Sequence, residues 1–578
     1  MSFIRRKPLV SLLLFLVSLG VYLPSLRNGF VWDDVETIEQ SYYIYNASSM
    51  GDMFIPPVKE PKDALYYRPL IYASMVLDKA LWGVTPFGFH LSNVVLNAFS
   101  TVCAYLLSLL LFGVSGYERK YGAAFIAGLL FALYPMHVES VSWVSGRSDV
   151  LCALFFFLAL IFHILSLRKT GFIPLTTAFF ILSLSSKEVA VVFPVTALAF
   201  DLINGSGGRK ANMLRYVIYA SVLALFFYLK GRTYVNFPEL SSVRIPDASP
   251  VSEILGAVNV ALASYMYYFT KLVFPYTFNA FTAKAPGGPA YVISSVVTFG
   301  LLALGVFYSV KKRSGVCAFA LLWIPVTLLP SVLLALTDIP SASVAERYLY
   351  IPSAGFSLLL AWIFVYAPQS GRGRGVLLAA AFILAASYLV FTIGRQRVWR
   401  DSVSLWGDTV GKSPKSAIPH INYGLALLGE GKDDEALKEL LRNFDESVEI
   451  NARGRAVTAN NIGVVYINKK DVLNAERWFL KAYGYDPGYY KTSYHLGLVF
   501  YLKGKSGGSR EDYVDALGYL NESLRIKPFY GKAYLLQAIV YGELGERDKA
   551  RESAGRALEC GLTDKLAAKA RKIISAPE

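Results

Sequence analysis

The sequence predicts an all-α protein in two parts, a polytopic bundle of about eleven membrane-spanning helices followed by a solenoid of helical repeats. Of the 578 residues, 54% are hydrophobic and only 17% are charged, whereas soluble domains average about 25% charged residues. The charges are also unevenly divided, because 46 of the first 394 residues are charged against 53 of the last 184. We therefore expect a membrane domain over residues 1–394 and a soluble domain over 395–578, which excludes a wholly soluble or disordered chain.

The first apolar run covers residues 9–26 and follows Arg5, Arg6 and Lys7. It lacks the small-residue cleavage site of a signal peptide, so we expect an uncleaved span whose N-terminus is cytoplasmic. Ten further spans are expected near 90–113, 121–135, 149–167, 172–184, 187–203, 214–230, 290–310, 315–337, 350–367 and 376–394.

Clusters of Lys and Arg fall at every second turn between these runs, as cytoplasmic loops require. The clusters are Arg119-Lys120, Arg168-Lys169, Arg209-Lys210 with Arg215, Lys311 to Arg313, and Arg372 with Arg374. The number of membrane crossings agrees with these cytoplasmic turns only if residues 250–275 do not cross the membrane completely. We interpret that segment as a re-entrant or interfacial helix, since Tyr265, Tyr267, Tyr268 and Lys271 suit an interface. The C-terminal domain then lies outside the cytoplasm, and 27–87 is the first outer loop.

The C-terminal part repeats a pattern of about 34 residues. The best unit has small and large residues at the spacing of a tetratricopeptide repeat: Ile462, Gly463, Tyr466, Ala475, Phe479, Ala482 and Pro487. A second unit, from Leu496-Gly497 to Pro528, carries about seven inserted residues, 506–512, at its internal turn. Partial units flank these two, so we expect about four helical pairs with a concave face.

Two adjacent carboxylates, Asp33 and Asp34, open the first outer loop. Because neighbouring carboxylates repel, one of them is expected to have a raised pKa, as a general base requires. The alternative is a solvated loop that caps a helix.

Other polar residues accumulate at the same membrane face. The cations are Arg68, Arg147, Lys187 and Arg347, and they would suit an anionic membrane-anchored substrate, because arginine binds phosphate oxygens in two places. Singly, each could instead be an anchoring residue at the membrane boundary. The candidate supporting residues are His90, Asn93, His137, Glu139, Asp149, Glu188, Glu346 and Tyr348.

No cofactor is required by the sequence. His137 and Glu139 could be half of a magnesium or manganese site, with Asp33 and Asp34 as the rest, but no ligand spacing demands a metal and a hydrogen-bonded histidine is the alternative. His163 lies within a span and is expected to be packed. Gly371-Arg-Gly-Arg-Gly is not a nucleotide loop, and the basic residues indicate orientation in the bilayer, not nucleic-acid binding.

Several segments together resemble one family of membrane enzymes. They are 28–34 (NGFVWDD), 68–70, 81–93, 135–141, 146–149, 186–188, 346–353 and 398–401. In this order they are similar to the GT-C glycosyltransferases, and within them to the transmembrane and tetratricopeptide repeat containing O-mannosyltransferases and their bacterial relatives.

The resemblance implies a GT-C fold and an inverting transfer of a hexose, with mannose favoured, from a polyprenyl or dolichyl phosphate to a protein hydroxyl on the non-cytosolic face. It implies that Asp33 or Asp34 is the base and that Arg68, Arg147, Lys187 and Arg347 bind the donor phosphate. The repeats would hold the acceptor. The composition favours a bacterial inner membrane with periplasmic repeats, or the endoplasmic reticulum with lumenal repeats in a eukaryote.

Three alternatives stay open at this point. The acceptor could be a lipid or a glycan, with the same chemistry. The chain could be a non-catalytic scaffold whose repeats recruit partners, although a scaffold does not explain ionisable residues repeated at one membrane face. A transporter would place its charges at mid-depth between helices and not at one rim.

Overall fold

The computed structural model describes residues 7–39, 41–45, 51, 54, 66–204, 209–233, 250–283, 285–336, 344–367 and 370–576. The chain divides into two compact units. The membrane unit comprises Met1–Phe30 and Asp52–Arg400, and the repeat unit comprises Val31–Gly51 and Asp401–Glu578. Thus a short part of the predicted first outer loop groups with the repeats. Arg5 and Arg6, and most of 231–253, lie outside the described residues.

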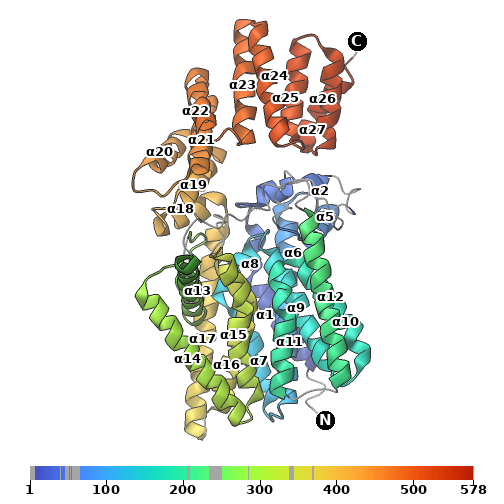
Figure 1. The fold of residues 1–578 in the computed structure, drawn as a ribbon, viewed down its shortest axis with the longest axis vertical. Helices are drawn as coiled ribbons and strands as arrows, with labels where there is room; N and C mark the ends of the chain where they lie inside the picture. The colour runs from blue at the N-terminus through green and yellow to red at the C-terminus, as the bar shows by residue number, and fades with distance from the viewer. Residues whose placement is uncertain are drawn as a thin grey trace. The chain divides into compact units, whose positions relative to one another are not determined.

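The described residues of both units form helices and no strand, apart from two isolated bridges, Thr282 to Val344 and Ser416 to Glu449. The all-α prediction is confirmed. The membrane unit (Figure 1) contains α1 (Lys7–Val21), α5 (Pro69–Trp82), α6 (Pro86–Val114), α7 (Lys120–Leu133), α8 (Val138–Ser142), α9 (Arg147–Ser166), α10 (Ile173–Ser186), α11 (Phe193–Asn204), α12 (Arg209–Thr233), α13 (Pro250–Val273), α14 (Pro289–Lys311), α15 (Gly315–Leu334), α16 (Tyr350–Tyr366) and α17 (Gly371–Gln396).

A helix lies at each of the eleven predicted spans. Among the described residues, seven helices are long and apolar enough to cross a membrane, and an eighth is counted if the bent pair Lys120–Leu133 and Pro135–Ser142 is one span. Two shorter apolar helices, Lys7–Val21 and Thr170–Ser186, occupy two more predicted positions. The bundle is therefore that of an integral membrane protein, while the number eleven stays a prediction.

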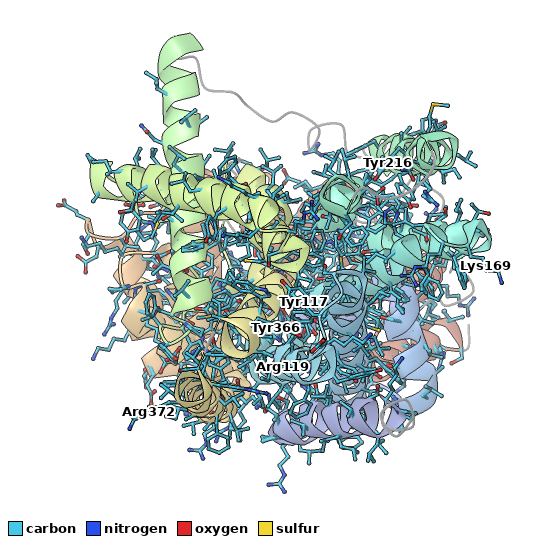
Figure 2. The ribbon with its side chains drawn as sticks, turned by 90° about the horizontal axis from the view of Figure 1, so that it is seen from below. Tyr117, Arg119, Lys169, Tyr216, Tyr366 and Arg372 are labelled. Carbon is cyan, nitrogen blue, oxygen red and sulfur yellow. The ribbon has the colours of Figure 1, made fainter. Side chains whose placement is uncertain are left out.

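Helix α13 runs across the bundle. It is seen nearly end-on in Figure 1 and along its length in Figure 2, whereas α17 is seen along its length in Figure 1 and end-on in Figure 2. This direction agrees with a helix that does not cross the membrane with the others. Tyr267, Tyr268 and Lys271 do not face an interface, however, because they are buried.

The two ends of the bundle differ in charge. Helix α6 begins near His90 and ends shortly before Arg119, and α9 begins at Arg147 and ends before Arg168. The basic turns and the candidate site therefore lie at opposite ends of the same helices. Figure 2 shows Arg119, Lys169 and Arg372, from three separate turns, at the lower end of the bundle.

The repeat unit is a series of antiparallel helix pairs (Figure 1). After α18 (Ser402–Lys412) the pairs are α19 (Ala417–Gly429) with α20 (Asp433–Leu441), α21 (Ala452–Asn468) with α22 (Val472–Tyr485), α23 (Tyr490–Gly507) with α24 (Arg510–Ile526), and α25 (Gly531–Glu543) with α26 (Arg547–Glu559), followed by α27 (Asp564–Ile574). The described residues of this unit thus contain four such pairs, where the sequence predicts about four.

Small residues let the helices of each pair approach closely. A Cβ atom at Gly463 would lie 2.5 Å from the ring of Phe479, and one at Gly497 would lie 2.8 Å from Leu520. The predicted insertion at 506–512 does not make a long loop. It lengthens α23 and α24, which are joined by a short turn at Gly508, where φ is +69°.

Candidate active site

Polar side chains from several helix ends of the membrane unit meet around Tyr348. The Nζ atom of Lys187 lies 4.8 Å from the centroid of the Tyr348 ring, and the guanidinium carbon of Arg347 lies 5.0 Å from it. All three side chains are buried. We call the following residues the Tyr348 cluster: Arg68, Glu139, Asp149, Lys187, Glu188, Lys271, Glu346, Arg347 and Tyr348.

Arg347 is held by Glu139. Its Nη1 atom lies 2.5 Å from Oε1 of Glu139, and its backbone N–H donates to Oε2 of the same carboxylate at 3.1 Å. The guanidinium also lies 5.4 Å from the ring of Trp143. Glu139 and Arg347 stand 208 positions apart in the sequence, so this pair joins α8 to the 3₁₀ helix Glu346–Leu349 that precedes α16.

Lys187 follows the end of α10 and pairs with Asp149 in the first turn of α9. The distance between Lys187 Nζ and Asp149 Oδ1 is 2.7 Å. The second oxygen, Asp149 Oδ2, is buried and has no hydrogen-bond partner in the described structure. A buried acceptor of this kind is costly unless something donates to it.

Arg68 is the most exposed cation of the cluster, with 21% of its side chain accessible. Its Nε and Nη2 atoms donate to the two oxygens of Glu188 at 2.9 and 2.7 Å, which is a bidentate pair. Burial disfavours the charged guanidinium, but Glu188 outweighs this effect and raises the pKa of Arg68 above its usual range. The Arg68 side chain is therefore fully charged when a phosphate binds.

Lys271, near the C-terminal end of α13, completes the Tyr348 cluster. Its ammonium lies 2.9 Å from Oε1 of Glu346, and the backbone N–H of Asn279 donates to the same oxygen at 2.6 Å. The cluster thus holds four cations and four carboxylates. Its formal charges balance before any substrate binds.

Arg147 has a different environment from the other predicted cations. Its side chain is completely buried, and its Nη2 atom lies 2.5 Å from Asp78. It also donates to the side chain of Asn93 at 2.6 Å and to the carbonyl oxygen of Phe89 at 2.9 Å. Arg147 and Asn93 therefore tie the start of α9 to α5 and α6.

The two histidines at this end are packed. His137 Nε2 lies 2.8 Å from the Ser353 hydroxyl, and its ring centroid lies 4.2 Å from that of Tyr350. His90 Nε2 lies 3.3 Å from the carbonyl oxygen of Gly29. His137 and Glu139 thus turn to different partners, and no group of three metal-binding side chains occurs among the described residues. His137 is hydrogen-bonded through Nε2, and its metal role stays untested.

His163 is also packed, at the other end of α9. Its Nδ1 lies 2.9 Å from the Tyr219 hydroxyl and its Nε2 lies 3.1 Å from Asp201. Tyr216 donates to the second oxygen of Asp201 at 2.7 Å. These bonds satisfy the histidine, as expected for a packed residue.

Asp33 and Asp34 belong to the repeat unit. Asp34 is fully buried, and its Oδ2 accepts a hydrogen bond from the backbone N–H of Val31 at 3.1 Å. The preceding residue, Trp32, has φ of +55°, which is uncommon for a bulky side chain and often marks functional sites.

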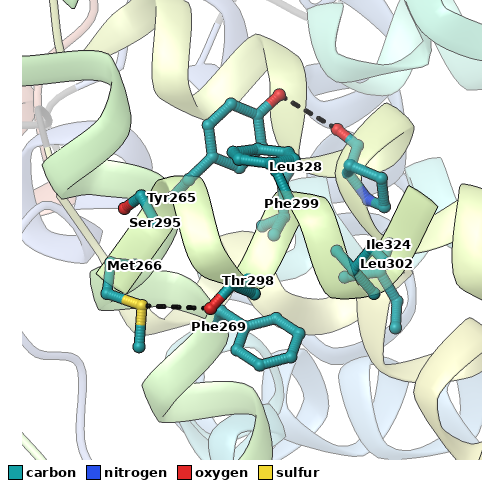
Figure 3. A pocket seen from close by; sticks show the side chains of 10 residues that line it. Tyr265, Met266, Phe269, Ser295, Thr298, Phe299, Leu302, Ile324 and Leu328 are labelled. Carbon is teal, nitrogen blue, oxygen red and sulfur yellow. Dashed lines mark hydrogen bonds between the residues drawn. The ribbon is translucent and has the colours of Figure 1, made fainter. Parts of the chain in front are cut away.

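An apolar pocket lies between α13, α14 and α15 (Figure 3). Its polar groups are already hydrogen-bonded, because the hydroxyl of Tyr265 donates to the carbonyl oxygen of Pro325 at 3.1 Å and that of Ser295 to Tyr291 at 2.8 Å. The pocket therefore offers hydrocarbon surface to a ligand. Its lining residues are Tyr265, Met266, Phe269, Ser295, Thr298, Phe299, Leu302, Ile324, Pro325 and Leu328.

Sequence reasoning missed two ionic residues of this end, Lys271 and Asp78. The sequence predicts an interface position for Lys271, because this residue follows an apolar, tyrosine-rich run. Asp78 lies inside α5, a mostly apolar helix. A charge within an apolar helix is the signal that could have found it.

Comparison with known proteins confirms the resemblance to O-mannosyltransferases. A protein O-mannosyl-transferase of Caenorhabditis elegans is 26% identical over 74% of this chain and 61% of its own length. Human protein O-mannosyl-transferase TMTC3 is 23% identical over 93% of this chain and 62% of its own length. The chain spans about three fifths of the length of these relatives.

Other comparisons are weaker. No protein-family model matches the chain. Among solved structures, ArnT from Cupriavidus metallidurans, bound to undecaprenyl phosphate, is 16% identical over 84% of this chain and 80% of its own, with a TM-score of 0.41.

Proposed function

We propose that this protein is an inverting glycosyltransferase that moves a hexose, with mannose favoured, from a polyprenyl or dolichyl phosphate to a hydroxyl of a protein. The observation that carries the proposal is the Tyr348 cluster, in which four cations converge at one end of a membrane bundle. An anchor or scaffold has no need of buried charges, which are costly in a membrane protein. The similarity to protein O-mannosyl-transferases supports the same activity.

The reaction is a single displacement. The acceptor oxygen attacks the anomeric carbon, the bond from that carbon to the phosphate oxygen breaks, and the phosphate leaves with the electron pair. Asp33 or Asp34 takes the hydroxyl proton as general base. Attack opposite the leaving group inverts the anomeric configuration.

The cations stabilise the charge that grows on the phosphate as it leaves. Arg68 is the best candidate to bind it, because its fork of donors matches phosphate geometry and its side chain is partly exposed. Lys187 and Arg347 complete the binding site around Tyr348. Arg147 keeps the ends of α5, α6 and α9 together.

The donor's prenyl chain is assigned to the apolar pocket between α13, α14 and α15. In support, α13 contributes both the pocket residues Tyr265 and Phe269 and the ammonium of Lys271 beside Glu346. Filling the pocket by Leu302→Trp should raise the donor KM several-fold. Leu304→Trp on the same helix is the control, since Leu304 is 65% exposed.

The acceptor is a protein segment held by the repeats, on the non-cytosolic side. In a bacterium this places the repeats in the periplasm of the inner membrane, and in a eukaryote in the lumen of the endoplasmic reticulum. If the acceptor were a lipid or glycan, removal of the repeats would be tolerated better.

The test is transfer from a mannosyl-phosphoryl-polyprenol to Ser/Thr peptides by the purified protein. Asp33→Asn with Asp34→Asn should lower the rate by about 10²–10⁴-fold, the usual contribution of a general base. Asp548→Asn, at an exposed position in α26, is the control. Full turnover by the double variant would refute the assigned base.

A further inference from the structure

The segment that carries the two aspartates is structurally part of the repeat unit. Residues 31–51 stand in the sequence between elements of the membrane unit, yet they group with 401–578. The described part contains a turn at Val31 to Asp34, a helical turn over Val35–Glu39 and a short helix over Tyr42–Tyr45. The following inference rests on the proposed role of Asp33 and Asp34.

Trp406 of α18 contacts this segment directly. Its ring meets that of Trp32 edge-to-face, with centroids 5.1 Å apart and planes at 77°. Trp406 is 2% exposed, so its position is fixed by the surrounding helices. An edge-to-face contact between two tryptophans is both large and directional.

The backbone of Trp32 needs such support. A bulky residue at φ +55° is held in a sparsely populated conformation, which persists only when the surrounding structure fixes it. Asp33 and Asp34 follow immediately. The carbonyl oxygen of Asp33 accepts a hydrogen bond from Thr37 N–H at 2.8 Å, and Asp34 accepts one from Val31 N–H at 3.1 Å. A change at Trp32 would therefore be transmitted to the backbone of Asp33 and to the carboxylate of Asp34.

The segment also influences residues farther along the solenoid electrostatically. Burial is the main cause of the raised pKa values of Tyr489 and Tyr530, and the nearby carboxylate of Glu36 raises both further. Tyr489 precedes α23 and Tyr530 precedes α25. The segment thus contacts α18, and the charge of Glu36 acts on tyrosines that precede two later helices.

We propose that Trp406 is a positioning residue for the reaction, which fixes the backbone of Trp32 and thereby the carboxylates of Asp33 and Asp34. The repeat domain then does more than bind an acceptor. It also holds the general base in position. Small displacements of a catalytic group are sufficient to slow a reaction by orders of magnitude.

The experiment compares Trp406→Ala with Trp406→Phe in the full-length protein. Hydrogen exchange of the amides in 31–39 and the kinetics of transfer are measured together. Trp406→Ala should lose protection at 31–39 and lower kcat at least about tenfold with the donor KM unchanged. Trp406→Phe, which keeps an aromatic edge, should restore most of both. Unchanged protection in Trp406→Ala would overturn the proposal.

Two controls separate positioning from general damage. Trp478→Ala removes a tryptophan of the same unit, packed against Phe444 with centroids 5.8 Å apart, and should leave exchange at 31–39 unchanged. Trp32→Ala removes the same contact from the loop side, without touching the solenoid core. Its effect on kcat should not add to that of Trp406→Ala, whereas additive effects would contradict a shared contact.

Different experimental results would refute the proposed function and the positioning role of Trp406. If Asp33→Asn with Asp34→Asn keeps full turnover, the assigned base is wrong and the inference falls with it, even if Trp406 orders the segment. If that double variant is inactive but Trp406→Ala keeps both protection and kcat, the base stands and the positioning role is wrong.

Discussion

Several ion pairs of the membrane unit are buried, whereas most of those in the repeat unit are exposed. In the membrane unit, Lys187 with Asp149 and Arg347 with Glu139 expose at most 10% of any side chain. In the repeat unit, the side chains of Lys432 and Glu430 are 43% and 49% exposed. Exposed pairs add little to stability, whereas a buried pair requires two desolvated charges that depend on each other. The two buried pairs of the bundle should therefore matter more to stability than the exposed pair of the repeats.

The largest effect should come from breaking one buried pair. Lys187→Met removes the partner of Asp149, whose Oδ2 already lacks a hydrogen bond in the described structure. We expect a destabilisation of about 3–5 kcal/mol, because one charge remains buried without its counter-charge. Thermal unfolding in detergent measures it.

A double variant sharpens this comparison. Lys187→Met with Asp149→Asn removes both charges and should recover more than half of the lost stability. Equal unfolding temperatures for the single and double variants would show that the pair is not the cause.

The repeat unit should be most sensitive to packing. Gly463→Ala places a methyl group 2.5 Å from a Phe479 ring atom, and such overpacking costs about 1–3 kcal/mol. Gly484→Ala is the matched control, since a Cβ there meets nothing within 4 Å. It should stabilise α22 by about 0.5–1 kcal/mol. A smaller loss at Gly463 than at Lys187 would confirm the difference between the units.

The repeats were predictable from sequence because their signal is local. Gly463, Ala475 and Phe479 meet across one helix pair, and their spacing alone reveals the contact. The gathering of Arg68, Lys187 and Arg347 was also predictable, since each stands beside an apolar run, on the membrane face that the sequence predicts to be the outer one. All-α architecture follows from the same periodicity.

The pairing of the charges was not predictable. Glu139 and Arg347 are 208 positions apart, and no sequence pattern specifies which acid meets which base. The sequence predicts cations that face one cavity. In the structure, each of these cations pairs with a carboxylate. Nothing in the sequence of residues 31–51 indicates that they group with the repeats, because the grouping is made by tertiary contacts such as that between Trp32 and Trp406.

Arg68→Lys tests the geometry of a partly exposed pair. A lysine keeps the charge but cannot make the two parallel bonds to Glu188 that Arg68 makes at 2.9 and 2.7 Å. We expect kcat/KM for the donor to fall about tenfold, equivalent to about 1.4 kcal/mol. The unfolding temperature should be nearly unchanged. Arg453→Lys, in an exposed pair of the repeat unit, should leave kcat/KM unaltered.

A smaller, pH-dependent effect is expected at His420 in the repeat unit. The hydrogen bond to Glu439, at 2.5 Å, raises the pKa of His420 and outweighs burial, which lowers it. The folded state therefore binds the proton more tightly. Its stabilising contribution is complete below the unfolded pKa of about 6.5 and is lost as the pH rises through the higher folded pKa.

The measurement is the unfolding temperature as a function of pH. That of the wild type should fall relative to His420→Gln as the pH rises above about 6.5. Glu439→Gln should remove the same pH dependence. Parallel curves for the wild type and His420→Gln would contradict the assignment.

The smallest effect is expected for the exposed pair between Lys549 and Glu546. Their charged atoms are 2.6 Å apart, but 61% of the lysine side chain is accessible. Water solvates both charges in the folded and unfolded states, so Lys549→Ala should leave the unfolding temperature and the transfer rate unchanged within error. The same charge removed at Lys187 should be severely damaging. A measurable loss at Lys549 would mean that exposure is not what separates the ion pairs of the two units.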